Sequence, residues 1–188
     1  MGLFRKNNVS VAVLAITIIM SLGIALPSIN KDINDPNLIV YHNADEGWLM
    51  DTIWYYYSGE KRLSFRIESD YGLIMPYLAS FARHVLNRFM IITPGTFVLI
   101  LRWMYLVSWL GALFILWLII GKHFGKGWKQ SLGVLLLGIN GVFVYLLNNL
   151  KPDGMLLFFM LASLYYVLSI IDNPGLGHIL LAILFAGL

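Results

Sequence analysis

Cysteine is absent from the 188 residues, and charged side chains are scarce. The absence of cysteine excludes a disulfide framework, thiol chemistry and any metal site with cysteine ligands. Charged residues make up 12% of the chain and hydrophobic residues 59%, whereas a soluble domain is about 25% charged and roughly 45–50% apolar. This composition predicts a membrane protein. The 13 Lys and Arg residues are scattered and form no basic stripe, so we expect no nucleic-acid partner.

Several segments are apolar enough to enter a bilayer, and a helix of about 20 such residues is long enough to cross it. Four of them have this length: residues 9–27, 97–120, 131–149 and 155–171. A fifth, 178–188, begins like a span but is too short to cross about 30 Å of hydrocarbon. We therefore predict an all-α fold, a polytopic membrane helix bundle. We expect residues 1–188 to be a single transmembrane domain, truncated from a longer protein.

The positive-inside rule predicts how these spans are oriented. Arg5 and Lys6 precede the first span, and the link 121–130 carries three lysines and no acid. Both segments are therefore expected on the cytoplasmic side, and residues 28–96 with the short link 150–154 on the outside. The first apolar run exceeds the 7–15 residues usual in a signal peptide, and no A-x-A-like site follows it. We interpret it as a retained anchor of a multi-pass protein of the plasma (inner) membrane.

The outer loop, residues 28–96, contains two segments that resemble interfacial helices. The stretch "DEGWLMDTIWYYY" places an apolar and aromatic stripe at helical spacing, and Trp and Tyr are enriched at the headgroup level. The stretch "DYGLIMPYLASFARHVLNRFMII" is also apolar, but Pro76 interrupts it and it carries Arg83 and Arg88. If it crossed the membrane, the three lysines of the link 121–130 would fall outside. We therefore predict a large outer loop bearing interfacial helices.

Three polar features are candidates for chemistry, and each has a structural alternative. The pair Asp45 and Glu46 begins the first interfacial segment, where acids also simply favour a helix N-terminus. The turn "LKPDG" carries Lys151 and Asp153, and on their own these residues are better explained as its polar tip. Arg102 lies five residues inside the second span. An arginine there faces a cavity or a partner, or extends to the interface.

The predicted topology brings most of these features to one membrane face. Asp45, Glu46, Lys151 and Asp153 are all expected outside, and Asn148 and Asn149 end the third span beside them. Carboxylates and cations at an outer surface can handle a lipid phosphate and an incoming hydroxyl, and the two asparagines can add hydrogen bonds. We predict a shared site there and assign no metal ion and no cofactor to it.

The order of these features resembles the membrane glycosyltransferases of the GT-C superfamily. The resemblance is to the branch with protein mannosyltransferases and aminoarabinose transferases. That family has an Asp-Glu motif after its first span, matched by "NADEGW", and a Pro-containing aromatic stretch, matched by "YGLIMPYLASFARHVL". "LRWMYLV" with "GKHFGKGW" then matches its Arg-containing span and cytoplasmic turn. "LKPDGMLLFFMLASLYYV" matches its outer (R/K/L)P(D/E) turn and the helix that follows. No Lys-Pro-Pro triplet is present, so the family's phosphate-binding lysine stays unassigned.

The resemblance implies an enzyme that moves a sugar from a polyprenyl phosphate or pyrophosphate carrier to an acceptor outside the cytoplasm, with inversion. In family terms Asp45 is the general base, and Arg102 or Lys151 stabilises the leaving phosphate. Asp153 orients a substrate or holds Lys151, Glu46 supports the site, and Asn149 contacts substrate. The implied partners are a lipid-linked sugar donor, the bilayer, and an acceptor glycan, lipid or protein. Residues 1–188 are expected to be inactive alone, because more spans normally enclose such a site.

A different class of protein is kept as the alternative: a transporter or a non-catalytic membrane subunit. A transporter is expected to carry charges deep within its spans or to contain paired discontinuous helices. The centres of these spans are nearly free of ionisable groups, and Asn140 is the one polar side chain deep in the third span. We interpret Asn140 as a helix-packing residue. The acids predicted outside favour the enzyme.

Overall fold

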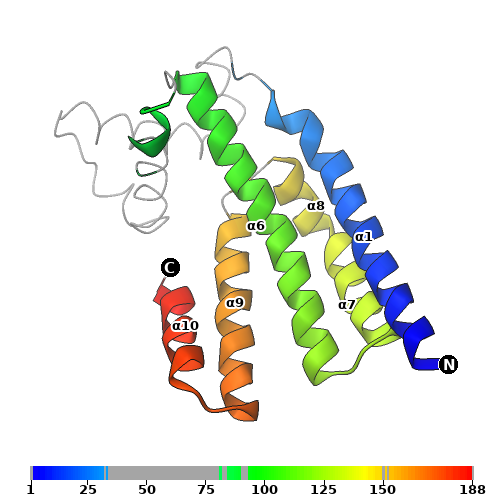
Figure 1. The fold of residues 1–188 in the computed structure, drawn as a ribbon. Coiled ribbons are helices and arrows are strands. Elements are labelled where there is room, and N and C mark those ends of the chain that lie inside the picture. Colours follow the sequence, from blue (N-terminus) through cyan, green and yellow to red (C-terminus); the bar gives the residue numbers. More distant parts are fainter. Residues whose placement is uncertain are drawn as a thin grey trace. The chain divides into compact units, whose positions relative to one another are not determined.

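The structure is a computed structural model. It describes residues 2–31, 33, 81, 84–89, 93–149, 151 and 153–187, of which residues 2–7 and Pro94 are described by their backbone only. Every long regular element in this part of the chain is an α-helix. The helices are α1 (Gly2–Ile29), α6 (Pro94–His123), α7 (Trp128–Gly138), α8 (Gly141–Asn148), α9 (Asp153–Asp172) and α10 (Leu176–Gly187) (Figure 1).

Three of these helices are long and apolar enough to cross a membrane: α1, α6 and α9. The pair α7 and α8 passes the same test as one bent span, while α10 is a shorter apolar helix. The prediction of an all-α membrane helix bundle is therefore confirmed. Helices α1 and α6 also extend beyond the predicted spans at both ends, into the polar residues that flank the apolar runs.

The chain divides into two compact units, which are described separately. The bundle unit comprises Met1–Ser28 and Met104–Leu188, and the second unit comprises Ile29–Trp103. The predicted interfacial helices fall in the second unit and lie almost entirely outside the described residues. Only residues 81 and 84–89 of them are described, and residues 84–89 form a short helical turn. That residues 1–188 are a single transmembrane domain stays a prediction.

Within the bundle unit, α6 and α7 form an antiparallel pair joined by a tight connection. Gly125 and Gly127 adopt φ angles of 101° and 92° there, a left-handed conformation that glycine adopts without a steric penalty. Gln130 of α7 is buried and links the two helices, because its Nε2 donates to the carbonyl of Trp117 on α6 over 2.8 Å. Gly121 provides the space for this side chain. The short connection and this hydrogen bond together hold the two helices side by side.

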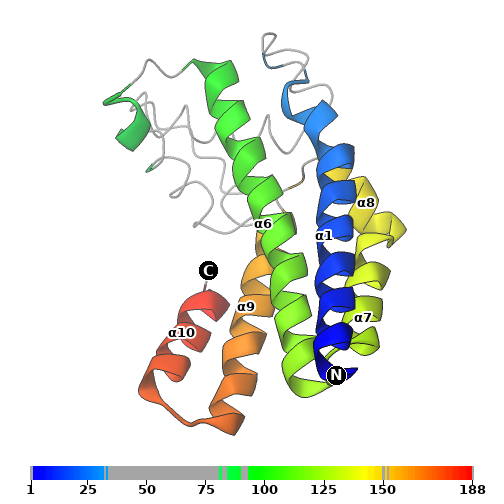
Figure 2. The same ribbon diagram turned by 45° about the vertical axis from the view of Figure 1, so that its right-hand side comes forward.

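Helix α1 packs along α7 and α8 in the bundle unit, and Figures 1 and 2 show these helices side by side. Thr17 lies against Gly138, where an added Cβ would overlap its methyl group. Near the other end of the contact, Ser28 Oγ lies 3.5 Å from Asn148 Oδ1. Small residues let membrane helices approach closely. These contacts show that α1 runs in the same direction as the path from α7 to α8.

Helix α9 runs antiparallel to α10 in a hairpin, and α9 also packs along α6. Gly111 of α6 accommodates the ring of Phe158 on α9, and the ends of α6 and α9 are joined by an ion pair between Lys122 and Asp172. These two contacts show that α6 and α9 are parallel. In the hairpin, Ser163 Oγ donates to the carbonyl of Ala182 over 3.1 Å. Stacked rings add to this contact: Tyr166, Phe159 and Phe185.

The third predicted span, residues 131–149, is broken near its middle, and this corrects the expectation of one continuous helix. α7 ends at Gly138, α8 begins at Gly141, and their axes differ by 56°. The cause is Asn140, whose Oδ1 accepts from the amides of Val142 and Phe143 over 3.0 and 3.2 Å. An asparagine in this role starts a new helix. Asn140 is therefore the N-cap of α8, and the helix-packing role expected from the sequence stays a prediction.

These directions give the bundle unit two chemically different ends. The lysine end is where α1 begins, α6 ends and α7 begins, and it carries Lys122, Lys126 and Lys129. The turn end is where α8 ends and α9 begins, and it carries Asn149, Lys151 and Asp153. The two segments predicted to be cytoplasmic thus lie at one end of the unit. Which side of a membrane that end faces stays a prediction.

Candidate functional site

The structure describes four of the six predicted site residues. Asn149, Lys151 and Asp153 lie together at the turn end of the bundle unit, and Arg102 lies in the second unit. The predicted base Asp45 and its neighbour Glu46 lie outside the described residues. Three of the four described site residues therefore lie where α8 ends and α9 begins.

The backbone of this turn is fastened to the bundle at Lys151. The indole Nε1 of Trp109, on α6, donates to the carbonyl of Lys151 over 3.3 Å. The amide of Lys151 donates to the carbonyl of Leu146 over 3.0 Å, and the amide of Gly154 donates back to the carbonyl of Lys151 over 3.4 Å. Hydrogen bonds to α6, α8 and α9 therefore hold the backbone amide and carbonyl of Lys151.

The Trp109 side chain is itself held in place from two sides. It is only 2% exposed, and its ring meets Phe143 of α8 edge to face with centroids 4.8 Å apart. Gly154 packs directly on the indole, so that a Cβ there would overlap the ring. Buried aromatic pairs of this kind favour one orientation over others. The indole can therefore act as a rigid support for the charged turn.

The polar side chains of the turn end have different degrees of exposure. Asp153 is exposed in the first turn of α9, where its carboxylate also complements the helix dipole. Lys151 is partly buried, and Asn149 donates from Nδ2 to the carbonyl of Tyr145 over 2.8 Å. Asn148 lies beside Ser28 of α1. The turn thus presents a carboxylate and a cation on a backbone whose position is fixed.

Arg102 has a structural role that its sequence context does not reveal. Its Nη1 donates to the carbonyls of Ile29 and Lys31 over 3.0 and 2.5 Å, and the residue is 5% exposed. Both carbonyls belong to the last turn of α1 and the residues after it, where backbone acceptors lose their helical donors. The guanidinium is buried and does not extend into solvent. Whether Arg102 also contacts a donor phosphate stays a prediction.

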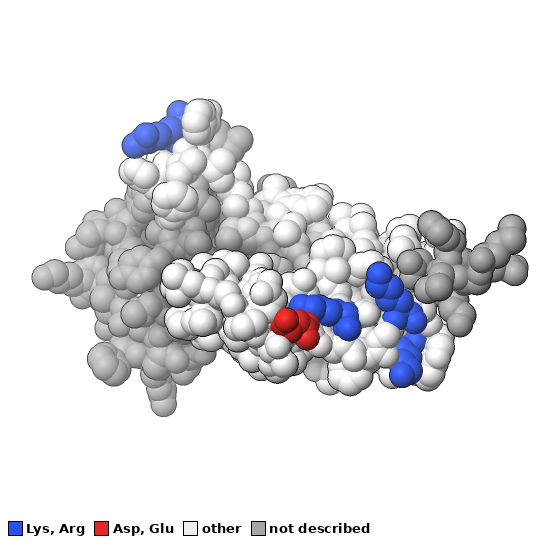
Figure 3. All heavy atoms as spheres, turned by 60° about the horizontal axis from the view of Figure 1, so that its bottom comes forward, with Lys and Arg blue, Asp and Glu red and all other residues white. Residues whose placement is uncertain are grey.

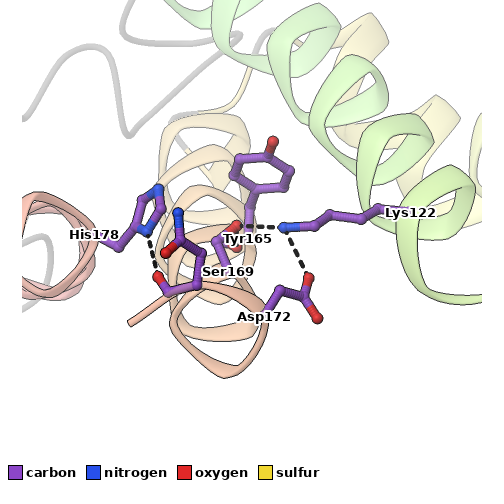
Figure 4. A network of polar contacts seen from close by, with 6 residues as sticks. Lys122, Tyr165, Ser169, Asp172 and His178 are labelled. Atoms are coloured by element: carbon purple, nitrogen blue, oxygen red, sulfur yellow. Dashed lines mark hydrogen bonds and ion pairs between the residues drawn. The ribbon is translucent and has the colours of Figure 1, made fainter. Parts of the chain in front are cut away.

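A polar network that the sequence did not predict lies at the lysine end. Lys122 Nζ contacts Ser169 Oγ at 2.9 Å and Asp172 Oδ2 at 3.0 Å, and it lies 5.5 Å from the ring centre of Tyr165 (Figure 4). Figure 3 looks toward this end of the bundle unit and shows basic side chains with a carboxylate beside one of them. Lys122 and Asp172 each lie at the end of a helix, and only the parallel packing of α6 and α9 brings them together.

Comparisons of the chain with protein-family models, with curated proteins and with solved structures found no match. Among the residues that the structure describes, no group of three or more His, Asp or Glu side chains is placed to hold a metal ion.

Proposed function

We propose that the chain works in a membrane glycosyltransferase of the GT-C type, which moves a sugar from a polyprenyl phosphate or pyrophosphate to an acceptor on the non-cytoplasmic face, with inversion. The observation that supports this most is the fastening of Lys151. A polar tip without a function needs no buried indole beneath its backbone, whereas a site that must meet a phosphate needs a positioned cation. The Trp109 contact holds the backbone carbonyl of the residue that carries this cation, and this supports the proposal.

In the proposed reaction, Asp45 takes the proton of the acceptor hydroxyl as the new bond forms. The acceptor oxygen attacks the anomeric carbon from the face opposite the phosphate, so the configuration inverts. The bond from the anomeric carbon to the phosphate oxygen breaks, and the phosphate leaves with the bonding electron pair. A phosphate leaving group needs no proton, but its charge is stabilised by a nearby cation. Lys151 is the cation assigned to this role.

The remaining residues have supporting roles in the proposal. Asp153 orients a substrate hydroxyl or holds the ammonium of Lys151, and Asn149 offers an amide to the sugar or phosphate. Glu46 supports Asp45 through hydrogen bonds. Arg102 is assigned to donor binding in addition to its bonds with the carbonyls after α1.

One observation favours the alternative of a transporter. α7 and α8 form a discontinuous apolar helix, and transporters often place their substrate sites at such breaks. The two functions differ in where the essential residues lie. An enzyme depends on the turn end, whereas a transporter of this type depends on the break at Asn140.

The test is sugar transfer by membranes that contain the complete protein, with a radiolabelled polyprenyl-phosphate sugar as donor. We expect the Lys151→Met variant to lose most of the transfer activity, and the Lys126→Met variant to retain it because Lys126 lies at the lysine end. Uptake of labelled solutes into vesicles is measured in parallel. Uptake that depends on Asn140, without any transfer, would replace the enzyme by the transporter.

A further inference from the structure

Residues 124–129, where α6 connects to α7, form a short basic and aromatic segment that we call the basic loop. The two segments that it joins are candidate membrane spans, α6 as a single helix and α7 with α8 as a bent one. Helix α6 ends at His123 and α7 begins at Trp128, so a connection of a few residues must turn the chain around. With both segments in the membrane, so short a connection cannot reach far from its surface. The basic loop then lies at the level of the lipid headgroups.

The two lysines of the basic loop differ from the nearby Lys122 in their partners. Lys122 contacts Asp172 at 3.0 Å and Ser169 at 2.9 Å. Lys126 and Lys129 are exposed, and neither ammonium group has an ion pair or hydrogen bond with a residue that the structure describes. On the face shown in Figure 3, the carboxylate lies next to only one of the basic side chains. The basic loop thus carries two positive charges that no described carboxylate neutralises.

Two large aromatic side chains flank Lys126 in the same loop. Phe124 is 64% exposed and Trp128 is 69% exposed. The backbone between them is fixed at Gly127, whose carbonyl accepts from the amide and the Oγ of Ser131 over 3.0 and 3.1 Å. Tryptophan is enriched at membrane–water interfaces, because its ring is apolar and its N–H is polar. Both rings can therefore enter the boundary between the headgroups and the acyl chains, beside the lysines.

We propose that the basic loop binds an anionic phospholipid, whose headgroup phosphate accepts from Lys126 and Lys129 and whose acyl chains contact Phe124 and Trp128. Lysines at a membrane surface attract anionic lipids within about a Debye length. A zwitterionic lipid carries its own positive group, so it neutralises two ammonium groups less well. An acidic protein segment would neutralise the lysines but would leave the aromatic rings without an apolar partner. The proposal depends neither on glycosyl transfer nor on which side of the membrane the lysine end faces.

The test measures which lipids the complete protein retains in detergent. Phosphatidylglycerol and phosphatidylcholine are added in equal amounts, and the bound lipids are counted by native mass spectrometry. We expect the wild type to retain phosphatidylglycerol in preference. One lysine near an anionic surface strengthens association roughly five-fold, so Lys126→Gln and Lys129→Gln should each lower the preference by about this factor. The matched control is Lys31→Gln, which removes the same charge from an exposed lysine beyond the end of α1.

The control separates a lipid site from an effect of net charge. We expect Lys31→Gln to leave the preference for phosphatidylglycerol unchanged. Equal losses in all three variants would show that only the net charge matters, and they would overturn the proposal. A wild type without any preference would also overturn it, and would leave the two lysines for an acidic protein partner.

Two further measurements test the aromatic rings and separate a lipid from a soluble phosphate. Trp128→Ala is expected to lower the amount of bound phosphatidylglycerol several-fold, and an unchanged amount overturns the role of the ring. Glycerol 3-phosphate, which has the phosphate but no acyl chain, is added to the wild type with sodium chloride at equal ionic strength as the control. We expect both to displace phosphatidylglycerol to the same small extent. Greater displacement by glycerol 3-phosphate shows a site for a soluble phosphate and overturns the proposal of a lipid.

Discussion

The indole Nε1 of Trp109 and the carbonyl of Lys151 are 3.3 Å apart, although 42 positions separate them in sequence. This bond ties the second long span to the turn between α8 and α9. Because Gly154 packs on the same indole, Trp109 contacts both the backbone of Lys151 and the start of α9. The position of Lys151 is thus set by a span and not by the short turn alone.

Gly154→Ala tests how closely this group is packed. Alanine favours helix over glycine by about 1 kcal/mol, so an open position would be stabilised. Here the added Cβ overlaps the indole of Trp109, and we expect a net loss of about 1–3 kcal/mol, as in other overpacked cores. The matched control is Gly177→Ala on α10, where a Cβ meets open space. Thermal unfolding in detergent gives the comparison, and equal melting temperatures would contradict the packing.

Arg102 separates a structural role from a binding role. Arg102→Met removes the donors to Ile29 and Lys31, and leaving such buried acceptors unpaired costs about 1–3 kcal/mol each at most. We therefore expect a lower melting temperature without any donor lipid present. If Arg102 also binds the donor phosphate, the apparent donor KM rises as well at a temperature where the variant is folded. An unchanged melting temperature would contradict the capping role.

The ion pair between Lys122 and Asp172 is expected to contribute little to stability. The two side chains are 34% and 48% exposed, and pairs with such exposure typically contribute about 0.2–1 kcal/mol. A double-mutant cycle with Lys122→Met and Asp172→Asn measures the coupling free energy. We expect a value in that range that falls as salt is added. A much larger coupling would show that the pair is shielded from solvent by something that the described residues do not include.

The sequence predicted where the helices lie better than how they meet. Residues 97–120 and 155–171 correspond to α6 and α9, because long apolar runs are a direct signal of membrane helices. The break at Asn140 was missed because one polar residue in an apolar run has two explanations. The available signal was the segment "GINGVF". A glycine typically follows the end of a helix, and an asparagine is a typical N-cap of the next one.

The contacts of the candidate site could not be predicted from the sequence for a different reason. An apolar run predicts that residues 97–120 form a membrane helix, but it carries no information on which face of that helix packs against which neighbour. Trp109 reaches Lys151 only because α6 and α9 are parallel and in a particular register. Arg102 was recognised as unusual from its place in a span, but its carbonyl partners lie 71 and 73 positions away.

The predicted orientation in the membrane can be tested with the two ends of the bundle unit. Lys151→Cys places a thiol at the turn end, and Lys126→Cys places one at the lysine end. In intact cells, a membrane-impermeant maleimide is expected to label the thiol at position 151 and not the one at position 126, because the lysine-rich link should be cytoplasmic. Labelling of the Lys126→Cys variant from outside would invert the topology and remove Asp153 from the proposed outer site.

The general base is the sharpest point of the proposed function. Asp45 lies outside the described residues, and its role is inferred from the resemblance of "NADEGW" to the GT-C Asp-Glu motif. Asp45→Asn keeps the size of the side chain but removes its basicity. We expect sugar transfer from a polyprenyl-phosphate donor to fall by roughly 10²–10⁴-fold, the usual contribution of general-base catalysis. Donor binding should change little, because cations hold the phosphate.

Glu46→Gln should reduce transfer less, and Asp172→Asn, at the lysine end, should leave it unchanged. Transfer at the wild-type rate in Asp45→Asn would leave Asp45 with the simpler role of an acid at the start of a surface helix.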